Sequence, residues 1–543
     1  VFRRRIDWIR SNCMRKIIFS LIVLSSFVLK AQQKVWVYFT DKPSVEEQDY
    51  SKYLSSRAIE RRAAQNIPFH FSDVAVNKSY IQKLKDLGVD VHVTSKWLNA
   101  SSVWVNSEEQ LEQIKSLSFV TKVEGVRAMK MNRAPDFYKQ NKTATASFTY
   151  GDSKAQIQQL KGDFLHDMNL RGQGMLIAVL DGGFDGVNTL GAFDSLWMNN
   201  RILATHDFVD GDTNVFHTGF HGRQVLSVLG AHIANEYVGT APYADYVLLK
   251  SEDQSSETKI EEDNWIAAAE FADSVGADII NSSVGYNEFD GGIGDYVYAD
   301  MDGRTTVISQ GAIFAHRKGM LVVVSMGNEG SSHWKYMLSP ADVDSVLSVG
   351  GVKADNTYHA GASKGPSSDG RQKPNVSARF NGVYYINGAN NPTTGNGTSF
   401  SAPLVAGLAA CLWQSDRSKS NYEILRLIER SSHQFNNPDN FIGYGVPNFA
   451  LAHGSISIEE EQLAQHVKVY PNPFQESFHI FTKELELDNY RFELFSVSGQ
   501  NISVSIRKES SEIIITPDNK LESGFYWLKV SDGQNSFTFK LIH

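Results

Sequence analysis

The stretch Leu176-Ile177-Ala178-Val179-Leu180-Asp181 decides the fold of this chain, because it is short, continuously apolar and ends in a carboxylate. Similar runs follow at residues 246–249, 278–280 and 321–324, with helical patterns between them at 264–275 and 305–318. A run without a polar face is expected for a strand covered on both sides, as in a parallel sheet. Residues 155–455 are therefore predicted to form an α/β domain, a parallel sheet covered by helices.

Small polar residues follow these predicted strands. They are Asp181-Gly182-Gly183, Ser282-Ser283 and Gly327-Asn328. In open α/β sheets, ligands bind where the strands end at their carboxyl edge. We therefore expect a functional site at this edge.

The segments on either side have a different character. Residues 33–131 predict a small α+β unit, with strands at 35–39, 89–93 and 102–105, helices at 46–64 and 108–116, and a solvated helix face at Glu60, Arg61 and Arg62. The polar residues 132–154 predict an exposed, cleavable linker. Residues 456–543 predict a small β-sandwich, from strand-like runs at 478–481, 491–497, 513–515, 525–530 and 537–542.

The N-terminal region has the pattern of a signal peptide. Met14-Arg15-Lys16 is basic, the run from Ile17 to Leu29 is apolar, and Ala31 offers a small residue for cleavage before Gln32. The apolar run is shorter than the roughly 20 residues that a membrane span needs, so we expect no transmembrane anchor. We interpret residues 14–32 as a signal peptide and the preceding residues as an upstream artefact; the alternative is a core strand or helix.

Composition limits the class of protein. The chain has 543 residues, 42% hydrophobic and 21% charged, as in globular proteins of several domains. Its 52 Lys and Arg against 61 Asp and Glu give a net charge of −9, which argues against nucleic acid as the main partner. Two cysteines, Cys13 and Cys411, exclude a disulfide framework.

The segment Gly397-Thr398-Ser399-Phe400-Ser401-Ala402-Pro403 leads into an apolar helical run at 404–413. Ser399 would lie at a helix N-terminus, where backbone N–H groups are free and the helix dipole is positive. Pro403 fits the first turn, where N–H groups lack intrahelical partners. Alone, this segment is equally explained by a Ser or Thr N-cap.

Three more residues change the interpretation of Ser399. A serine nucleophile needs a base, a carboxylate that orients the base, and a donor for the oxyanion. His221 opens a helical stretch, and Asp181 and Asn328 follow apolar strands. Each has an ordinary structural explanation, but together they supply every group that this chemistry requires.

These motifs resemble those of the subtilases, the subtilisin-like serine proteases. The resemblance lies in residues 177–185 around Asp181, His221-Gly222 with Gly239-Thr240-Ala241-Pro242, residues 281–285, Gly327-Asn328-Glu329-Gly330 and residues 397–403. It covers about 300 residues with five ordered motifs and implies a subtilisin-like fold and a secreted serine endopeptidase.

The resemblance also implies a role for each site residue. Ser399 would attack the peptide carbonyl after giving its proton to His221, and Asp181 would orient the imidazole. The Asn328 amide and the Ser399 N–H would hold the oxyanion. Ser283, Val284 and Gly285 would bind an extended substrate as an added strand. No cofactor would be required for the chemistry.

Four positions depart from the family pattern. The histidine motif continues with Arg223-Gln224, so a cation could lower the pKa of His221 if Arg223 points inward. Gly182 stands where Thr or Ser is commoner. Asn375 stands where Asp is usual, and we assign it no catalytic role.

The flanking segments resemble known accessory domains. Residues 33–131 are similar to a subtilase propeptide, which implies a folding aid and inhibitor removed by cleavage. The C-terminal segment contains Val469-Tyr470-Pro471-Asn472-Pro473-Phe474 and resembles the sorting domains of the type IX secretion system. It implies a secretion-machinery partner and a secreted or cell-surface protein; a generic adhesion module is the alternative.

Other functions remain to be weighed. His217 and His221 could suggest a zinc hydrolase, but the glutamate of His-Glu-x-x-His is missing. Asp207, Asp210 and Asp212 could hold a structural calcium ion, although a solvated turn explains them as well. Cys411 is expected in the core. The main rival is a catalytically silent subtilase fold used for binding or adhesion.

Overall fold

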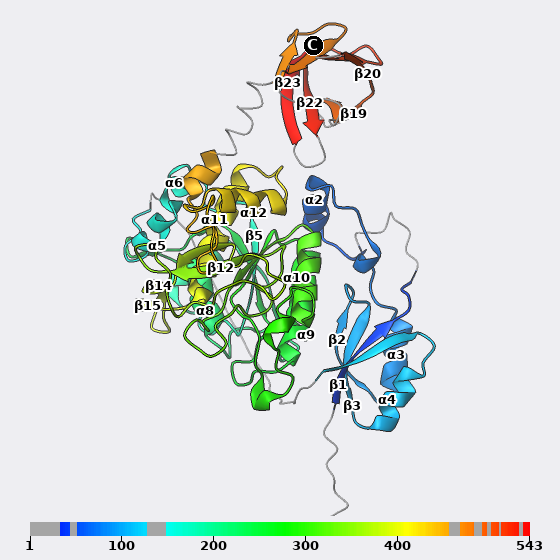
Figure 1. Ribbon diagram of the computed structural model, residues 1–543, viewed down its shortest axis with the longest axis vertical. Coiled ribbons are helices and arrows are strands. Elements are labelled where there is room, and N and C mark those ends of the chain that lie inside the picture. Colours follow the sequence, from blue (N-terminus) through cyan, green and yellow to red (C-terminus); the bar gives the residue numbers. More distant parts are fainter. Residues whose placement is uncertain are drawn as a thin grey trace, which may run out of the picture. The chain divides into compact units, whose positions relative to one another are not determined.

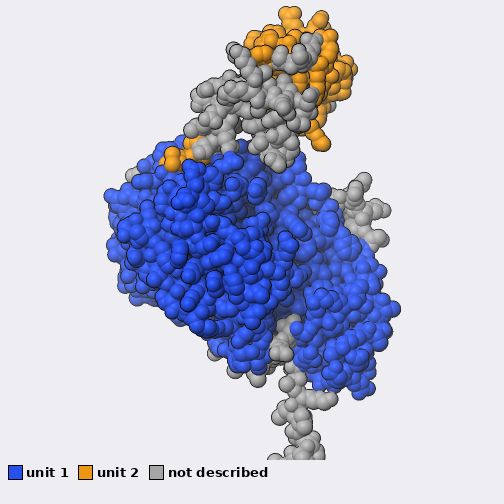
Figure 2. Space-filling model, in the orientation of Figure 1, with its two compact units in different colours: residues 1–449 blue, residues 450–543 orange. Residues whose placement is uncertain are grey.

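The computed structural model describes residues 33–43, 52–126, 148–454, 467–482, 491–496, 501–509, 512–531 and 536–543. Two compact units, Val1–Phe449 and Ala450–His543, are distinguished by their internal contacts (Figure 2). The predicted signal peptide at 14–32 lies outside the described residues, as do residues 132–147 of the predicted linker. No described helix is both long enough and apolar enough to cross a bilayer.

A seven-stranded parallel sheet forms the centre of the larger unit (Figure 1). In spatial order its strands are β13 (Val376–Arg379), β12 (Leu347–Val352), β11 (Leu321–Ser325), β10 (Ile279–Ser282), β5 (Leu176–Asp181), β9 (Asp245–Lys250) and β6 (Ile202–Asp207). The four apolar runs predicted as strands are β5, β9, β10 and β11, and every residue of β5, β10 and β11 is buried. The predicted parallel sheet is therefore confirmed.

Helices cover both faces of this sheet. Helix α9 (Ile260–Val275) packs against β5 and β9, and α10 (Val307–Arg317) packs against β11 and α9. Helix α11 (Thr398–Ser415) packs along β10 to β13 and against α8 (His221–Gly230). Leu176, Ala178 and Leu180 share one core cluster with Trp265 of α9 and Ile308 of α10, as expected when alternate residues of a strand face the same side.

Shorter elements complete this unit. They are α5 (Lys154–Gln159), α6 (Gly162–Asp167), η3 (Gly191–Phe193), α7 (Asp194–Met198), β7 (His232–Ile233), β8 (Tyr237–Val238), η4 (Asp290–Gly292), η5 (Tyr298–Asp300), β14 (Val383–Ile386), β15 (Pro392–Gly395) and α12 (Asn421–Arg430).

The N-terminal segment forms a four-stranded antiparallel sheet in the order β2-β3-β1-β4. Its elements are β1 (Gln33–Phe39), α2 (Ser56–Ala64), η2 (Phe71–Asp73), α3 (Lys78–Asp86), β2 (Asp90–Ser95), β3 (Ala100–Val105), α4 (Glu108–Lys115) and β4 (Val120–Val126). Helices α3 and α4 share a core with the sheet, whereas β2 contacts α9 of the larger domain. The α+β prediction is confirmed, but the described part of the helix expected at 46–64 is confined to Ser56–Ala64.

The prediction of a solvated face on this helix is wrong for two of its three residues. Glu60 is exposed, but Arg61 and Arg62 are both only 3% exposed. Arg61 pairs with Asp273 of α9 at 2.6 Å, and Arg62 reaches Asp273 and Asp73 at 2.7 and 2.8 Å. Asp273, the partner that both arginines share, lies more than 200 positions away in the sequence, so local charge patterning could not reveal it.

The C-terminal unit contains two antiparallel sheets, β16-β17-β21-β20 and β19-β18-β22-β23. The strands are β16 (Val467–Tyr470), β17 (Phe478–Thr482), β18 (Arg491–Ser496), β19 (Asn501–Ile502), β20 (Val504–Glu509), β21 (Glu512–Pro517), β22 (Phe525–Ser531) and β23 (Ser536–Ile542). One core joins the two sheets, with Ile480 and Ile515 from the first and Leu494 and Leu528 from the second. The predicted β-sandwich is therefore confirmed.

Candidate active site

A buried carboxylate and a histidine meet at the carboxyl edge of the sheet. Asp181 is the last residue of β5 and is fully buried, and His221 is the first residue of α8. The two side chains are joined between His221 Nδ1 and Asp181 Oδ1 at 2.7 Å. The N–H of Gly182 donates to the same oxygen at 2.7 Å, which fixes the carboxylate.

Gly222 allows the first turn of α8 to approach β5 so closely. A Cβ atom at this position would lie 2.6 Å from the Gly183 carbonyl oxygen and 3.0 Å from the Cβ of Asp181. Any side chain would therefore push the helix away from the strand. The glycine after His221 is required for the contact between His221 and Asp181.

The electrostatic surroundings favour the protonated form of His221. Burial alone lowers the pKa of the imidazole, but the charge and hydrogen bond of Asp181 and the charge of Glu252 outweigh it and raise the pKa to about 9. Burial and the nearby Asp181 raise the pKa of Glu252 to about 8. Glu252 was not singled out in the sequence, although it lies two residues beyond β9, at the same edge of the sheet as Asp181.

Ser399 lies in the same cavity as His221. The cavity has a volume of about 510 Å³, and its walls include His221, Asn328 and Ser399. The His221 side chain is 25% exposed, so part of the ring is accessible from this cavity. Within the described chain, no hydrogen bond joins the His221 ring to the Ser399 hydroxyl. Such bonds are often long in structures without substrate and tighten when it binds.

Helix α11 begins earlier than expected, and this changes the part that Pro403 plays. The helix starts at Thr398, so Pro403 is its sixth residue and lies beyond the first turn. Proline has no N–H, and the helical partner that it leaves free is the carbonyl four residues earlier, that of Ser399. The Ser283 hydroxyl donates to this carbonyl at 2.9 Å, which replaces the missing helical bond.

Asn328 is held beside the start of α11. Its Oδ1 accepts the N–H of Thr398 at 2.9 Å, which leaves the amide Nδ2 as a donor on the other side. A Cβ atom at Gly397 would lie 3.6 Å from both the Nδ2 and the Oδ1 of Asn328 and 3.7 Å from the backbone N of Ser399. The side-chain amide of Asn328 and the backbone N–H of Ser399 therefore lie close together beside Gly397. Gly397 itself has φ of +148°, a conformation that side chains rarely adopt.

Ser283, Val284 and Gly285 also line the cavity. They continue β10 beyond its last paired residue, Ser282. The backbone N–H and C=O groups of these three residues make no hydrogen bonds to other described residues. A free backbone edge of this kind can pair with an extended peptide.

Arg223 does not point toward His221. Its guanidinium donates to the Asp185 carbonyl at 2.7 Å and lies over the exposed ring of Phe220. The pKa of His221 is raised rather than lowered, so the effect expected for an inward-pointing Arg223 is absent.

Asn375 is buried in a structural network. Its Oδ1 accepts from the backbone N–H of Ser348 at 3.0 Å and from Lys373 Nζ at 3.0 Å, and its Nδ2 donates to Glu429 at 2.7 Å. It has no place in the cavity lining.

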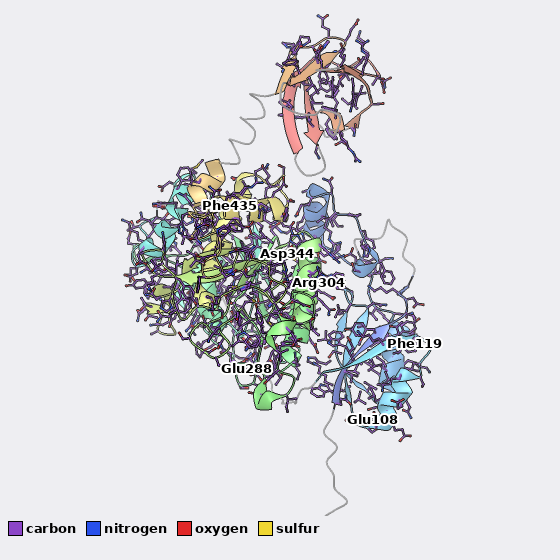
Figure 3. All side chains as sticks on the ribbon, viewed as in Figure 1. Glu108, Phe119, Glu288, Arg304, Asp344 and Phe435 are labelled. Carbon is purple, nitrogen blue, oxygen red and sulfur yellow. The ribbon has the colours of Figure 1, made fainter. Side chains whose placement is uncertain are left out.

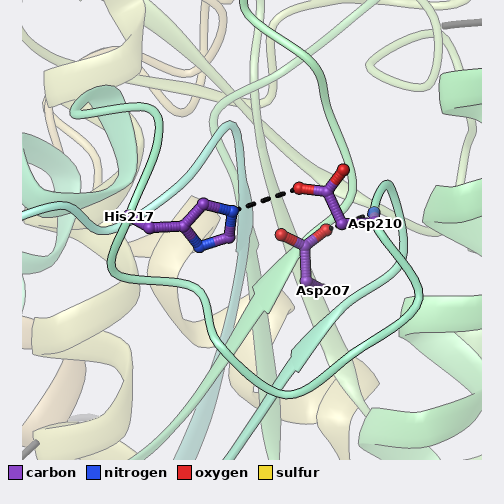
Figure 4. Close-up of side chains that lie close together, drawn as sticks. All are labelled: Asp207, Asp210 and His217. Carbon is purple, nitrogen blue, oxygen red and sulfur yellow. Dashed lines mark hydrogen bonds and ion pairs between the residues drawn. The ribbon is translucent and has the colours of Figure 1, made fainter. Parts of the chain in front are cut away.

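Of the three aspartates considered for calcium, Asp207 and Asp210 lie together with His217 around an internal cation, whereas Asp212 is not part of this group and accepts the N–H of Asn214 at 2.7 Å. Asp207, Asp210 and His217 have ligand atoms within 4.8 Å of one another (Figure 4). Lys250 Nζ lies 2.8 Å from Asp207 and 3.2 Å from Asp210, and His217 Nε2 lies 3.2 Å from Asp210. Because the Lys250 ammonium supplies the positive charge, these residues do not fit a metal ion.

The zinc interpretation also fails on geometry. His217 lies before α8, which begins at His221, so the two histidines do not share a helix face. Within the described chain, the group that includes His217 does not include His221, which is bound to Asp181. Cys411 is a fully buried free cysteine of α11, as predicted, and burial raises the pKa of its thiol.

Comparison with known proteins identifies the family. A sequence model of the Subtilase family matches residues 172–445, one of the Peptidase S8 propeptide domain of Bacteroidota matches 34–145, and one of the secretion system C-terminal sorting domain matches 468–543. The chain therefore belongs to the subtilase family.

Curated relatives agree with this assignment. The chain is 27% identical to thermophilic serine proteinase of Bacillus sp. (strain AK1) over 349 residues, 62% of this chain and 78% of that protein. It is 27% identical to subtilisin E of Bacillus subtilis (strain 168) over 303 residues, covering 54% and 70%. It is 23% identical to M-protease of Shouchella clausii (strain KSM-K16) over 408 residues, covering 74% and 94%. The protein is a subtilisin-like serine endopeptidase with a propeptide and a C-terminal sorting domain, which confirms the resemblance found in the sequence.

Proposed function

We propose that this endopeptidase cleaves peptide bonds with Ser399 as nucleophile, His221 as general base and Asp181 as the residue that orients His221. The observation that carries the proposal is the 2.7 Å contact of Asp181 with His221 in a cavity that Ser399 also lines. Because Asp181 holds Nδ1, the other ring nitrogen is left to take the Ser399 proton and to return it to the leaving amine. Asp181 also stabilises the imidazolium that forms.

Two donors would stabilise the oxyanion of the tetrahedral intermediate. The Asn328 amide and the Ser399 N–H lie close together beside Gly397, and Ser399 lies in the first turn of α11, where N–H groups have no helical partner. Donors that are fixed before the reaction stabilise developing charge without reorganising. The free backbone of Ser283 to Gly285 would hold the substrate as an added strand beside these donors.

The N-terminal domain would inhibit the enzyme until it is removed. Its sheet and α2 contact α9 through buried polar groups: Lys34 pairs with Asp263 at 2.5 Å, and Glu270 accepts the N–H groups of Lys96 and Trp97, both at 3.0 Å. These contacts support a propeptide that folds against the enzyme and stays bound after cleavage within residues 132–154.

The C-terminal sorting domain indicates a secreted or cell-surface protein. We propose that the type IX secretion machinery recognises it and that a signal peptide at 14–32 directs the first export step. The substrates are proteins or peptides, and the proposed chemistry uses side-chain and backbone groups alone.

The test uses the full chain and its Ser399→Ala variant. The wild-type protein should hydrolyse casein after propeptide removal and should be labelled by a serine-directed fluorophosphonate, and the variant should do neither. A folded wild-type protein that cleaves no peptide and takes no label would instead favour the silent binding protein. A chelator that blocks activity when the fluorophosphonate does not would contradict the serine mechanism.

A further inference from the structure

One side of the active-site cavity is strongly acidic. Beyond His221, Ser399 and Asn328, its lining includes Glu252, Asp253, Glu257 and Asp290, and no lysine or arginine of the described chain lines it. These residues come from the segment after β9 and from η4. The cavity in which the peptide bond would be cleaved therefore carries four carboxyl groups and no permanent cation.

Two of these four carboxyl groups, those of Glu252 and Glu257, have no partner among the described residues. Asp253 accepts from Ser255, and Asp290 accepts from the backbone N–H of Glu257 at 3.1 Å. The side chains of Glu252 and Glu257, in contrast, form no hydrogen bond or ion pair with any other described residue. Half-buried carboxylates without a partner are costly, so such groups suit a ligand that supplies the missing donors.

The pKa values of these two glutamates are raised, as burial among other carboxyl groups requires. Burial and then the charge of Asp181 raise the pKa of Glu252 to about 8, and burial and then Asp290 raise that of Glu257 to about 7. A positive group placed between them would favour their charged forms and lower both values.

We infer that the acidic side of the cavity, between Glu252 and Glu257, takes a lysine or arginine side chain that flanks the scissile bond of the substrate. Ammonium and guanidinium groups are donors only, and the unpaired carboxyl groups of Glu252 and Glu257 supply acceptors for them. The inference rests on the proposed function, because it takes Ser399 as the group that attacks this bond.

The experiment compares matched peptides on the processed full-chain enzyme. A fluorogenic peptide is made in a series that moves a single lysine through the positions on each side of the cleaved bond, and each member is paired with the same peptide carrying methionine. The kcat/KM ratio of lysine to methionine is measured with the enzyme concentration set by fluorophosphonate titration, so that misfolded protein does not count.

The wild-type enzyme should prefer lysine at one position by about tenfold or more, since a charge-assisted hydrogen bond is worth at least that factor. Glu252→Gln and Glu257→Gln should each lower the ratio, and the double variant should bring it close to one. Glu288→Gln is the matched control (Figure 3): it removes the same charge from a half-exposed residue that pairs with His333 outside the cavity lining, and it should leave the ratio unchanged.

The inference is overturned if no position favours lysine, or if the double variant keeps the wild-type ratio. It is overturned as well if Glu288→Gln lowers the ratio as much as the cavity variants do. Failure of the proposed function looks different, because then neither peptide of any pair is cleaved and the fluorophosphonate does not label the enzyme.

Discussion

Asp273 offers a direct test of how tightly the propeptide is held. This carboxylate of α9 is fully buried and pairs with Arg61 at 2.6 Å and with Arg62 at 2.7 Å, both from the propeptide. Asp273→Asn keeps the shape of the side chain but leaves two buried guanidinium groups without this charge. Among the described residues, Arg61 then has no other ion pair, whereas Arg62 keeps Asp73 at 2.8 Å.

The size of the effect follows from this geometry. Removing one partner of a buried ion pair costs about 3–5 kcal/mol, and solvent screening is negligible here because all three side chains are at most 4% exposed. Since Arg62 keeps its second partner, we expect the lower end, about 3 kcal/mol. The dissociation constant of the cleaved propeptide should then rise roughly 10²-fold.

The assay follows peptidase activity across a dilution series of the processed protein, because activity appears as the bound propeptide dissociates. Half of the activity should appear at a concentration roughly 10²-fold higher for Asp273→Asn than for the wild-type protein. At high dilution both proteins should reach the same kcat/KM. Glu60→Gln, at an exposed position of α2, is the control and should behave like the wild-type protein. Equal midpoints for Asp273→Asn and wild type would refute the reasoning.

Three further predictions concern the catalytic domain. Asn328→Ala should lower kcat by about 10²- to 10³-fold with little change in KM, because removal of one oxyanion donor causes a loss of this size in subtilisin. A change in KM alone, measured by steady-state kinetics, would contradict the role of Asn328 as an oxyanion donor. Because His221 must be neutral to accept a proton and its pKa is raised to about 9, kcat/KM should increase with pH up to that region. Glu252→Gln should move this increase to lower pH, because the charge of Glu252 helps to raise the pKa of His221. A shift of the pH–rate profile to higher pH would contradict this effect of Glu252 on His221. Lys250→Met should lower the free energy of unfolding in urea by about 3–5 kcal/mol, because it leaves the buried Asp207 without its ion-pair partner. The control is the same substitution at the exposed Lys154, and an equal loss of stability there would argue against this cause.

Much of the fold and the residues of the candidate site were predictable because the signals are local. Continuous apolar runs such as 176–180 are typical of strands that are covered on both faces. The residues that follow such strands, here Asp181 and Asn328, lie at the carboxyl edge of a parallel sheet. The same reasoning placed Ser399 at the start of a helix. The exact start of α11 at Thr398 was not predictable, because it depends on Gly397 and on bonds from Thr398 to Gly327 and Asn328.

The buried charges were not predictable. Arg61 and Arg62 have the spacing of a surface helix, and nothing near them in the sequence reveals Asp273. Likewise, Glu252 in a polar segment gives no sign that it shares a cavity with His221. In both cases burial depends on contacts between residues far apart in the sequence, whereas the sequence pattern reflects only interactions between near neighbours.

The polar groups of α9 that meet the propeptide have a consequence for the mature enzyme. Three carboxylates lie within 11 positions of this helix: Asp263, Glu270 and Asp273. Lys34 pairs with the first, Arg61 and Arg62 pair with the last, and the middle one accepts backbone N–H groups of the propeptide. Once the propeptide leaves, these carboxylates are uncovered as a ridge of like charge on the helix surface. Maturation thus changes the outer electrostatics of the enzyme, and dissolved salt should stabilise the freed form more than the precursor by screening the repulsion along this ridge.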